Sequence, residues 1–144
     1  MNQKIIGSFA QVTLPDFGDI EVTAKVDTGA YSGAVHCEDI SVVERGGTRF
    51  LKFRPYSHEN PEIEISAFHE RFVRSSTGHR VSRYLIDTTI LIDGVEYPIA
   101  IGLSDRSELK FQVLLGRRFL REQNILVDTR INQHLDKDGE LANL

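Results

Sequence analysis

Cysteine is nearly absent from this sequence, because Cys37 is the single one among 144 residues. An intrachain disulfide is therefore excluded, and a hydrophobic core has to stabilise the fold, for which this length is sufficient. No apolar run is long enough to cross a membrane, and residues 1–10 lack the pattern of a secretory signal peptide. These absences predict a protein of the reducing cytoplasm with no membrane partner.

An excess of positive charge is also missing, since the formal net charge at pH 7 is -4. This balance argues against a general nucleic-acid-binding protein, although it does not describe local patches. No repeat, low-complexity tract or linker divides the chain. We therefore expect a single domain over residues 1–144, with loose ends at 1–4 and 132–144.

Motifs for nucleotide and metal binding are missing as well. The glycine pair in residues 45–48 lacks the Gly-Lys-Ser/Thr ending that would bind a phosphate. His58 and His69 are each followed by glutamate but lack a second histidine three positions further on. A zinc site assembled only in space, such as His36 with His69, remains open, but we predict no metal and no cofactor. Cys37 is next to His36, and adjacent side chains on a strand point to opposite faces, which argues against a Cys-His nucleophile from this pair.

What the chain does contain is alternation of apolar and polar residues, typical of half-buried strands. Glycine-containing turns at 46–47 and 93–94 predict hairpins. One helix is expected, at 116–123. The predicted strands are 5–14, 20–27, 40–44, 48–53, 62–68, 71–75, 81–92, 95–103, 111–115 and 125–128. Many short strands with one short helix predict an all-β barrel or sandwich.

One strand ends on residues that can do chemistry. The alternation over residues 20–26 carries Asp27 to the strand end, where Thr28 and Gly29 form a tight turn. Gly29 has no Cβ, so its N–H can approach a carboxylate closely. An aspartic peptidase needs one carboxylate held in this way from each half of its active site. Because the same three residue types also close ordinary strands, the tripeptide alone leaves both interpretations open.

Further segments resemble a known family. Residues 113–120 are similar to the apolar-apolar-Gly-Arg segment of retroviral-type aspartic peptidases. The 25–30 segment, His36, the turn at 75–78 and Asp105-Arg106-Ser107 are similar to a prokaryotic retropepsin-like family. That family has been labelled "ATP-dependent zinc protease" and is often found beside RimK-type glutamate ligases. The resemblance extends over about residues 8–130.

This resemblance implies a pepsin-like closed barrel with one lobe per chain, and a homodimer whose two copies of Asp27 face each other across a two-fold axis. Asp27, Thr28 and Gly29 are the expected catalytic residues. In viral members an acid just after the Asp-Thr-Gly-Ala segment pairs with the arginine of the Gly-Arg motif. Tyr31 and Ser32 stand there in this chain, so the partner of that arginine is open.

The predicted flap, residues 71–83, contains no acidic residue. If it covers the cleft, its positive charge favours an acidic, glutamate-rich peptide substrate. The predicted substrate-binding residues are Ala30, Arg71, Arg74, His79, Arg80 and Arg83. The alternative is that these arginines form a solvated hairpin edge, where charge discourages strand pairing.

Other functions stay as alternatives. The same fold and dimer could serve as a non-catalytic peptide-binding module, since a fold does not by itself confer activity. A zinc-dependent peptidase is a further alternative. Asp128 and Thr129 are not expected to form a second half-site, because glycine does not follow them and a two-lobed enzyme needs about twice this length.

Overall fold

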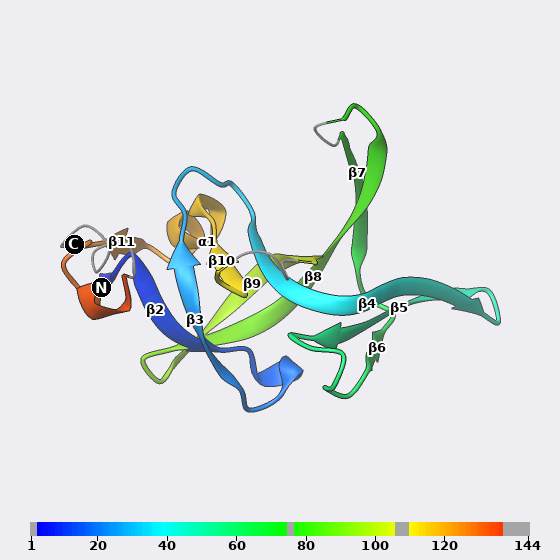
Figure 1. The fold of residues 1–144 in the computed structure, drawn as a ribbon, viewed down its shortest axis with the longest axis horizontal. Helices are drawn as coiled ribbons and strands as arrows, with labels where there is room; N and C mark the ends of the chain where they lie inside the picture. The colour runs from blue at the N-terminus through cyan, green and yellow to red at the C-terminus, as the bar shows by residue number, and fades with distance from the viewer. Residues whose placement is uncertain (1–2, 75–76, 106–109, 137–144) are drawn as a thin grey trace.

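The computed structural model describes residues 3–74, 77–105 and 110–136. Strands dominate them, as predicted, and the single α-helix is α1 (Arg117–Glu122) near the C-terminal end (Figure 1). The strands are β1 (Lys4–Ile6), β2 (Phe9–Thr13), β3 (Glu21–Val26), β4 (Gly33–Arg45), β5 (Thr48–Pro55), β6 (Ile63–Ile65), β7 (His69–Arg74), β8 (Arg80–Ile92), β9 (Val95–Ser104), β10 (Val113–Leu115) and β11 (Ile125–Val127). Two 3-10 turns are η1 (Pro15–Phe17) and η2 (Gln133–Leu135). No helix among these residues has the length and apolar character needed to cross a membrane.

Six strands form a ring of hydrogen-bonded neighbours, in the order β10, β3, β2, β8, β9, β4 and back to β10. The ring confirms the all-β class. Its interior is apolar: Val12, Ile90, Ile101, Val113 and Leu115 are fully buried there. Burial of such side chains contributes about 1.5–3 kcal/mol each relative to exposure, which stabilises the fold without a disulfide.

Two hairpins form where glycine predicts them. Gly46 and Gly47 have φ of 59° and 80° between β4 and β5, and Asp93 and Gly94 have φ of 52° and 75° between β8 and β9. Positive φ at both central residues is the geometry that matches the twist of paired strands. The β4–β5 hairpin extends as a long arm to one side of the ring, with β6 added to its edge (Figure 1).

The N-terminal strand differs from the prediction, since 5–14 is divided into β1 and β2 at Gly7. A Cβ on Gly7 would lie 2.1 Å from the carbonyl oxygen of Ile131, so the chain passes too close there for any side chain. The ends are also less loose than expected. Lys4 pairs with Ile125 in the sheet β1–β11, and Asn132 donates to the Phe9 carbonyl oxygen at 3.3 Å. Residues 137–144 lie outside the described part.

Residues 31–37 have no clear sequence pattern, and residues 33–37 form the start of the long strand β4. The predicted strand at 62–68 is reduced to β6, three residues that pair with β5. Beyond the ring, β7 and the first half of β8 project together as a hairpin (Figure 1). We call residues 69–85 the flap hairpin; its Ser75 and Ser76 lie outside the described residues.

Candidate active site

The Asp27 loop is placed by a strand crossing. Strand β10 runs between β3 and β4, parallel to the first and antiparallel to the second. Leu115 is level with Val26, and Leu114 is level with Ala34. The connection from β3 to β4, residues 27–32, therefore passes over the end of β10. Two strands that are distant in sequence from β10 hold this loop from both sides.

Asp27 is the first residue of that loop and is partly exposed. Its N–H donates to the Leu115 carbonyl oxygen at 2.9 Å, which ties the backbone to β10. Its Oδ1 accepts the N–H of Gly29 at 2.9 Å, as predicted from the absence of a Cβ. The Thr28 hydroxyl is exposed and makes no hydrogen bond to another described residue. The carboxylate is thus oriented by one backbone donor and remains open to a ligand.

Arg117 has a partner that sequence reasoning left open. Its Nη1 donates to the Gly29 carbonyl oxygen at 2.8 Å, and its guanidinium lies 5.4 Å from the centre of the Tyr31 ring. Its backbone N–H donates to the Ala30 carbonyl oxygen at 2.8 Å. A hydrogen bond to the main chain and a cation–π contact thus occupy the arginine in a loop that has no acid after Ala30.

Two glycines allow the close approach of backbone that this crossing needs. A Cβ on Gly116 would lie 2.5 Å from the Tyr31 carbonyl oxygen, and one on Gly33 would lie 2.5 Å from the Leu114 carbonyl oxygen. Both obstacles are backbone atoms, which cannot rotate away. Each residue of the Gly116-Arg117 pair therefore has a structural role. Gly116 leaves room for the 27–32 loop to pass close to it, and Arg117 is hydrogen-bonded to that loop.

Asp128 occupies a similar local turn with a different outcome. Its Oδ1 accepts the backbone N–H of Arg130 at 2.9 Å, as Asp27 does from Gly29. The Arg130 guanidinium, however, also pairs with both Asp128 oxygens, at 2.9 and 2.8 Å. These hydrogen bonds lower the pKa of Asp128 to about 2. A carboxylate neutralised in this way is unsuited to proton transfer near neutral pH. This agrees with the expectation that Asp128 does not form a second half-site.

The flap arginines lie in two directly opposed pairs. Arg71 is level with Arg83, and Arg74 is level with Arg80. The two pairs are an odd number of residues apart on each strand, so they face opposite sides of the hairpin. All four side chains are exposed, and none pairs with a carboxylate among the residues described. Opposed like charges cost stability in a hairpin, so this arrangement is not explained by strand pairing.

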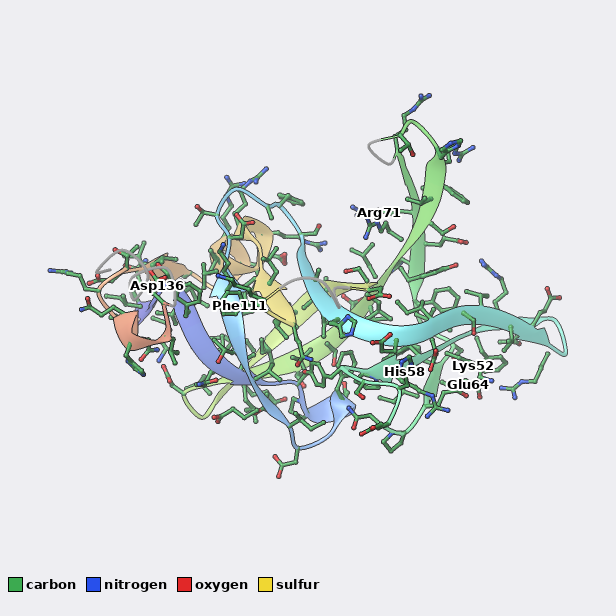
Figure 2. All side chains as sticks on the ribbon, viewed as in Figure 1. Lys52, His58, Glu64, Arg71, Phe111 and Asp136 are labelled. Carbon is green, nitrogen blue, oxygen red and sulfur yellow. The ribbon has the colours of Figure 1, made fainter. Side chains whose placement is uncertain are left out.

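The two faces of the flap hairpin differ in what they meet. Arg71 projects towards the body of the molecule (Figure 2), where it lines a hollow of about 360 Å³ together with Arg118 and two acidic residues, Glu70 and Asp87. On the other face, the Arg80 guanidinium lies 4.5 Å from the centre of the exposed Phe72 ring. His79 is exposed in the turn between the strands. The roles predicted for these residues remain predictions.

The histidine sites differ from the set considered on the sequence. His36 is buried, and two carboxylates approach its ring: Oε1 of Glu38 at 3.1 Å from Nε2, and Oδ1 of Asp105 at 3.7 Å from Nδ1. His69 instead lies 3.9 Å from Asp87. Sequence reasoning missed Glu38, although two residues after His36 on a strand is the same-face position. Asp105 comes from a distant connection and gives no local signal.

Cys37 is fully buried, and burial together with the nearby Glu38 charge raises the pKa of its thiol to about 12. A buried thiol of this kind is inert at neutral pH. The expectation that Cys37 and His36 do not form a nucleophilic pair agrees with this environment.

Curated relatives cover this chain as part of a longer protein. A protein named "Probable alpha-L-glutamate ligase" from Shewanella pealeana is 28% identical over 97% of this chain and 31% of its own length. One with the same name from Parasynechococcus marenigrum is 29% identical over 89% of this chain and 28% of its own length. The chain therefore spans less than a third of the length of these relatives.

A solved structure and a family profile agree with the architecture. The crystal structure of Lpg0085 from Legionella pneumophila, titled as a protein with unknown function (DUF785), superposes with a TM-score of 0.66 at 24% identity. It covers 90% of this chain and 96% of the other, and it supports the fold. The profile described as "RimB-like: Retropepsin-like aspartic endopeptidase RimB" matches residues 5–137, which include the Asp27 loop, the flap hairpin and the Gly116-Arg117 pair. This chain belongs to the RimB-like family of retropepsin-like aspartic endopeptidases.

Proposed function

We propose that two copies of this chain pair to form an aspartic endopeptidase, with one Asp27 from each copy at the shared site. The observation that carries the proposal is the state of the Asp27 carboxylate. One oxygen is held by the Gly29 N–H at 2.9 Å, and the other has no hydrogen bond to a described residue. The carboxylate is partly exposed at the end of a strand, and its loop is anchored by Arg117, whose N–H donates to the Ala30 carbonyl oxygen and whose Nη1 donates to the Gly29 carbonyl oxygen. Membership of the family supports the same chemistry.

The mechanism follows from pairing two such carboxylates. At a separation of a few ångströms both cannot ionise easily, so they share one proton and titrate as a pair. The ionised Asp27 takes a proton from a bound water as the water oxygen attacks the scissile carbonyl carbon, while the protonated Asp27 donates its proton to the carbonyl oxygen. The C–N bond then breaks as a proton passes to the amine nitrogen. No covalent bond to the enzyme forms.

The second acid of the site comes from a second chain in this proposal. Asp128 is neutralised by Arg130, so it does not complete the site. The exposed Thr28 hydroxyl, next to Asp27, is available to hold the partner's loop in register. A two-fold axis through the Asp27 loops is the arrangement that brings equal carboxylates together.

The Asp27→Asn variant tests the assignment, with Asp128→Asn as a matched control. Replacement of the catalytic acid should lower cleavage of a peptide mixture by at least about 100-fold, since general acid–base catalysis contributes about 10²–10⁴. The control should retain activity. A Asp27→Asn protein that still cleaves contradicts the proposal.

A mixing experiment tests whether activity requires one Asp27 from each of two chains. When wild-type and Asp27→Asn chains are mixed and allowed to exchange, sites with two intact acids fall as the square of the wild-type fraction. The proposal predicts that activity follows this square. Activity in linear proportion to the wild-type fraction would mean that each chain is active alone.

The preferred substrate that we propose is an acidic, glutamate-rich peptide. Arg71 supports it, because this guanidinium lines the hollow beside the flap hairpin together with Arg118 and has no carboxylate partner in the described part of the chain. Guanidinium groups bind carboxylates in bidentate fashion. The relatives named for glutamate ligation point to the same chemistry.

Cleavage of oligoglutamate and of a neutral peptide of equal length tests the preference. Wild type should favour oligoglutamate, and Arg71→Gln should raise KM for it by about tenfold, as expected when one charge-assisted pair is lost. Arg121→Gln, an exposed arginine of α1 outside the predicted substrate-binding set, is the matched control. Equal rates on both peptides would exclude an acidic preference. If no peptide is cut but oligoglutamate is bound, the non-catalytic binding module is the correct function.

A further inference from the structure

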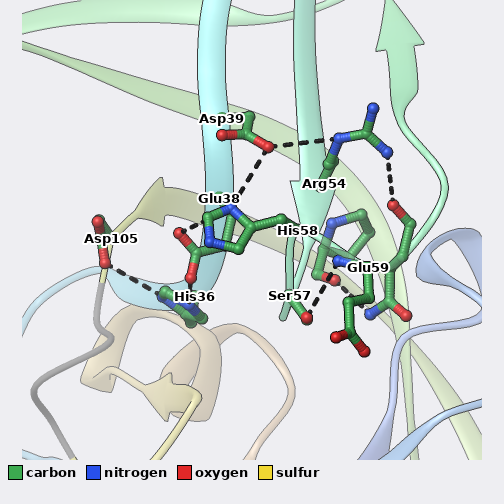
Figure 3. Close-up of polar contacts among 10 residues, drawn as sticks. His36, Glu38, Asp39, Arg54, Ser57, His58, Glu59 and Asp105 are labelled. Carbon is green, nitrogen blue, oxygen red and sulfur yellow. Dashed lines mark hydrogen bonds and ion pairs between the residues drawn. The ribbon is translucent and has the colours of Figure 1, made fainter.

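A cluster of side chains that could bind a metal ion lies at β4, with Asp105 beside the strand (Figure 3). His36 and Glu38 extend from the same face of the strand, and Asp105 approaches from the residue after β9. One ligand atom from each of the three lies within 4.8 Å of the others. Small side-chain rotations bring such a set onto one ion, because ligands of zinc at about 2.0–2.2 Å lie about 3–3.5 Å apart.

The two carboxylates approach different nitrogens of the imidazole, with Glu38 Oε1 facing Nε2 and Asp105 Oδ1 facing Nδ1 at 3.7 Å. A shared ion at Nε2 therefore requires Asp105, the exposed ligand, to rotate towards Glu38. The 3.1 Å between Nε2 of His36 and Oε1 of Glu38 is already the spacing of two zinc ligands. His58 stands on the far side of Glu38, with Nδ1 4.0 Å from Oε2 (Figure 3). A transition ion that binds imidazole and carboxylates would thus find three ligands, with His58 as a neighbouring donor.

Charge supports a cation in the same place. Three carboxylates gather here, from Glu38, Asp39 and Asp105, and Arg54 pairs with Asp39 at 3.3 Å. Carboxylates beside an imidazole are ligands that Zn²⁺ takes in proteins.

Burial of one side and exposure of the other provide an entry path. His36 is 3% exposed and Glu38 is 17% exposed, whereas Asp105 is 62% exposed. The histidine is therefore held rigidly by β4, and the ion can arrive from solvent on the side of Asp105. Rigid placement of the first ligand with an accessible second one favours metal binding over a wholly surface cluster.

We propose that His36, Glu38 and Asp105 bind a divalent transition-metal ion of the zinc type, and that this ion has a structural role. It would tie Asp105, the first residue after β9, to β4. The backbone N–H of His36 already holds Gln112, just before β10, at 2.7 Å. Asp105 and Gln112, at the two ends of this connection, would then both be bound to His36, the first through the ion and the second through its backbone hydrogen bond.

The position of the cluster argues against a part in the peptide chemistry. His36 is hydrogen-bonded to Gln112, and Asp27 is hydrogen-bonded to Leu115. Gln112 and Leu115 are three residues apart, which corresponds to about 10 Å along a strand. An ion at the cluster is therefore too distant to activate a water at Asp27. This inference goes beyond the proposed peptidase and does not depend on it.

Titration of metal-free protein with Zn²⁺ by calorimetry, and with Co²⁺ by visible absorption, tests the site. We expect one ion per chain, with affinity lowered at least about tenfold in Glu38→Gln and in Asp105→Asn. Asp39→Asn is the matched control, an adjacent carboxylate that Arg54 already neutralises, and it should leave affinity nearly unchanged. Asp105 is exposed and Glu38 is partly exposed, so both variants should fold, whereas His36→Gln is less suitable because the ring is buried.

Thermal unfolding with and without Zn²⁺ gives a second readout that does not require activity. Zn²⁺ should raise the Tm of wild type and of Asp27→Asn alike, since an ion that binds the native state stabilises it. The rise should be absent in Glu38→Gln. Absence of binding to wild type overturns the proposal. So does a stability loss in Asp105→Asn that is the same with and without Zn²⁺, because the cluster would then be an ion pair of His36 alone.

Discussion

Arg117 donates a hydrogen bond from Nη1 to the carbonyl oxygen of Gly29 at 2.8 Å, across a sequence separation of 88 residues. The contact joins the first turn of α1 to the Asp27-Thr28-Gly29 tripeptide. Because the same guanidinium lies over the Tyr31 ring, the arginine holds the loop at two points. The geometry of Asp27 therefore depends on a residue that touches neither of its oxygens.

Replacement of Arg117 should affect both folding and the Asp27 loop. Arg117→Ala removes a charge-assisted hydrogen bond and should lower the free energy of unfolding by about 1–3 kcal/mol, measured in urea. Arg117→Lys keeps the charge but loses the planar fork and should recover part of this. Arg121→Ala, exposed on the same helix, is the control. Equal losses at Arg117 and Arg121 would contradict the role given to Arg117.

Addition of one methyl group at Gly116 should be poorly tolerated. The new Cβ would lie 2.5 Å from the Tyr31 carbonyl oxygen, so the loop or the helix has to move. We expect Gly116→Ala to destabilise by about 3 kcal/mol or more, at the severe end for single substitutions. In Gly102→Ala the nearest atom is at 3.4 Å, and the loss should be clearly smaller. Similar melting curves for the two variants would show that the crossing is not tightly packed.

Acid should weaken the protein through Asp128. Hydrogen bonds from Arg130 lower the pKa of this carboxyl to about 2, below the unfolded value of 3.8. A depressed native pKa stabilises the fold above the unfolded pKa, and the contribution is lost as pH falls from about 4 to about 2. Urea unfolding at pH 7 and pH 2.5 should therefore show a smaller acid-induced loss in Asp128→Asn than in wild type. An identical loss in both would mean that other carboxylates dominate.

Cys37 should be unreactive in the native protein. The thiol is fully buried and its pKa is raised to about 12, so little thiolate forms near pH 8. We expect alkylation by iodoacetamide to be about a thousandfold or more slower than for free cysteine. Labelling in denaturant should proceed at the ordinary rate and serves as the control. Rapid labelling of native protein would indicate that β4 opens locally.

Hairpins and strands were the parts that local sequence could predict. Positive φ at Gly46, Gly47, Asp93 and Gly94 is required by the turns themselves, and few other residues adopt it. The break at Gly7 and the start of β4 at Gly33 could not be read locally. At both positions the reason is another segment, at Ile131 and Leu114, that comes within contact of the glycine.

At the candidate site, the sequence by itself determined the acid, its short backbone donor and the family. The hydrogen bond between Asp27 and Gly29 spans two residues, so its geometry is set by the tripeptide. Only the tertiary structure decided what Arg117 holds and which side chains surround His36. Those contacts join β3 to α1 and β4 to the end of β9, and such pairings depend on chain crossings that no local pattern encodes. The residues of these contacts come together because the whole ring of strands folds, and burial of its apolar core supplies the free energy for that folding.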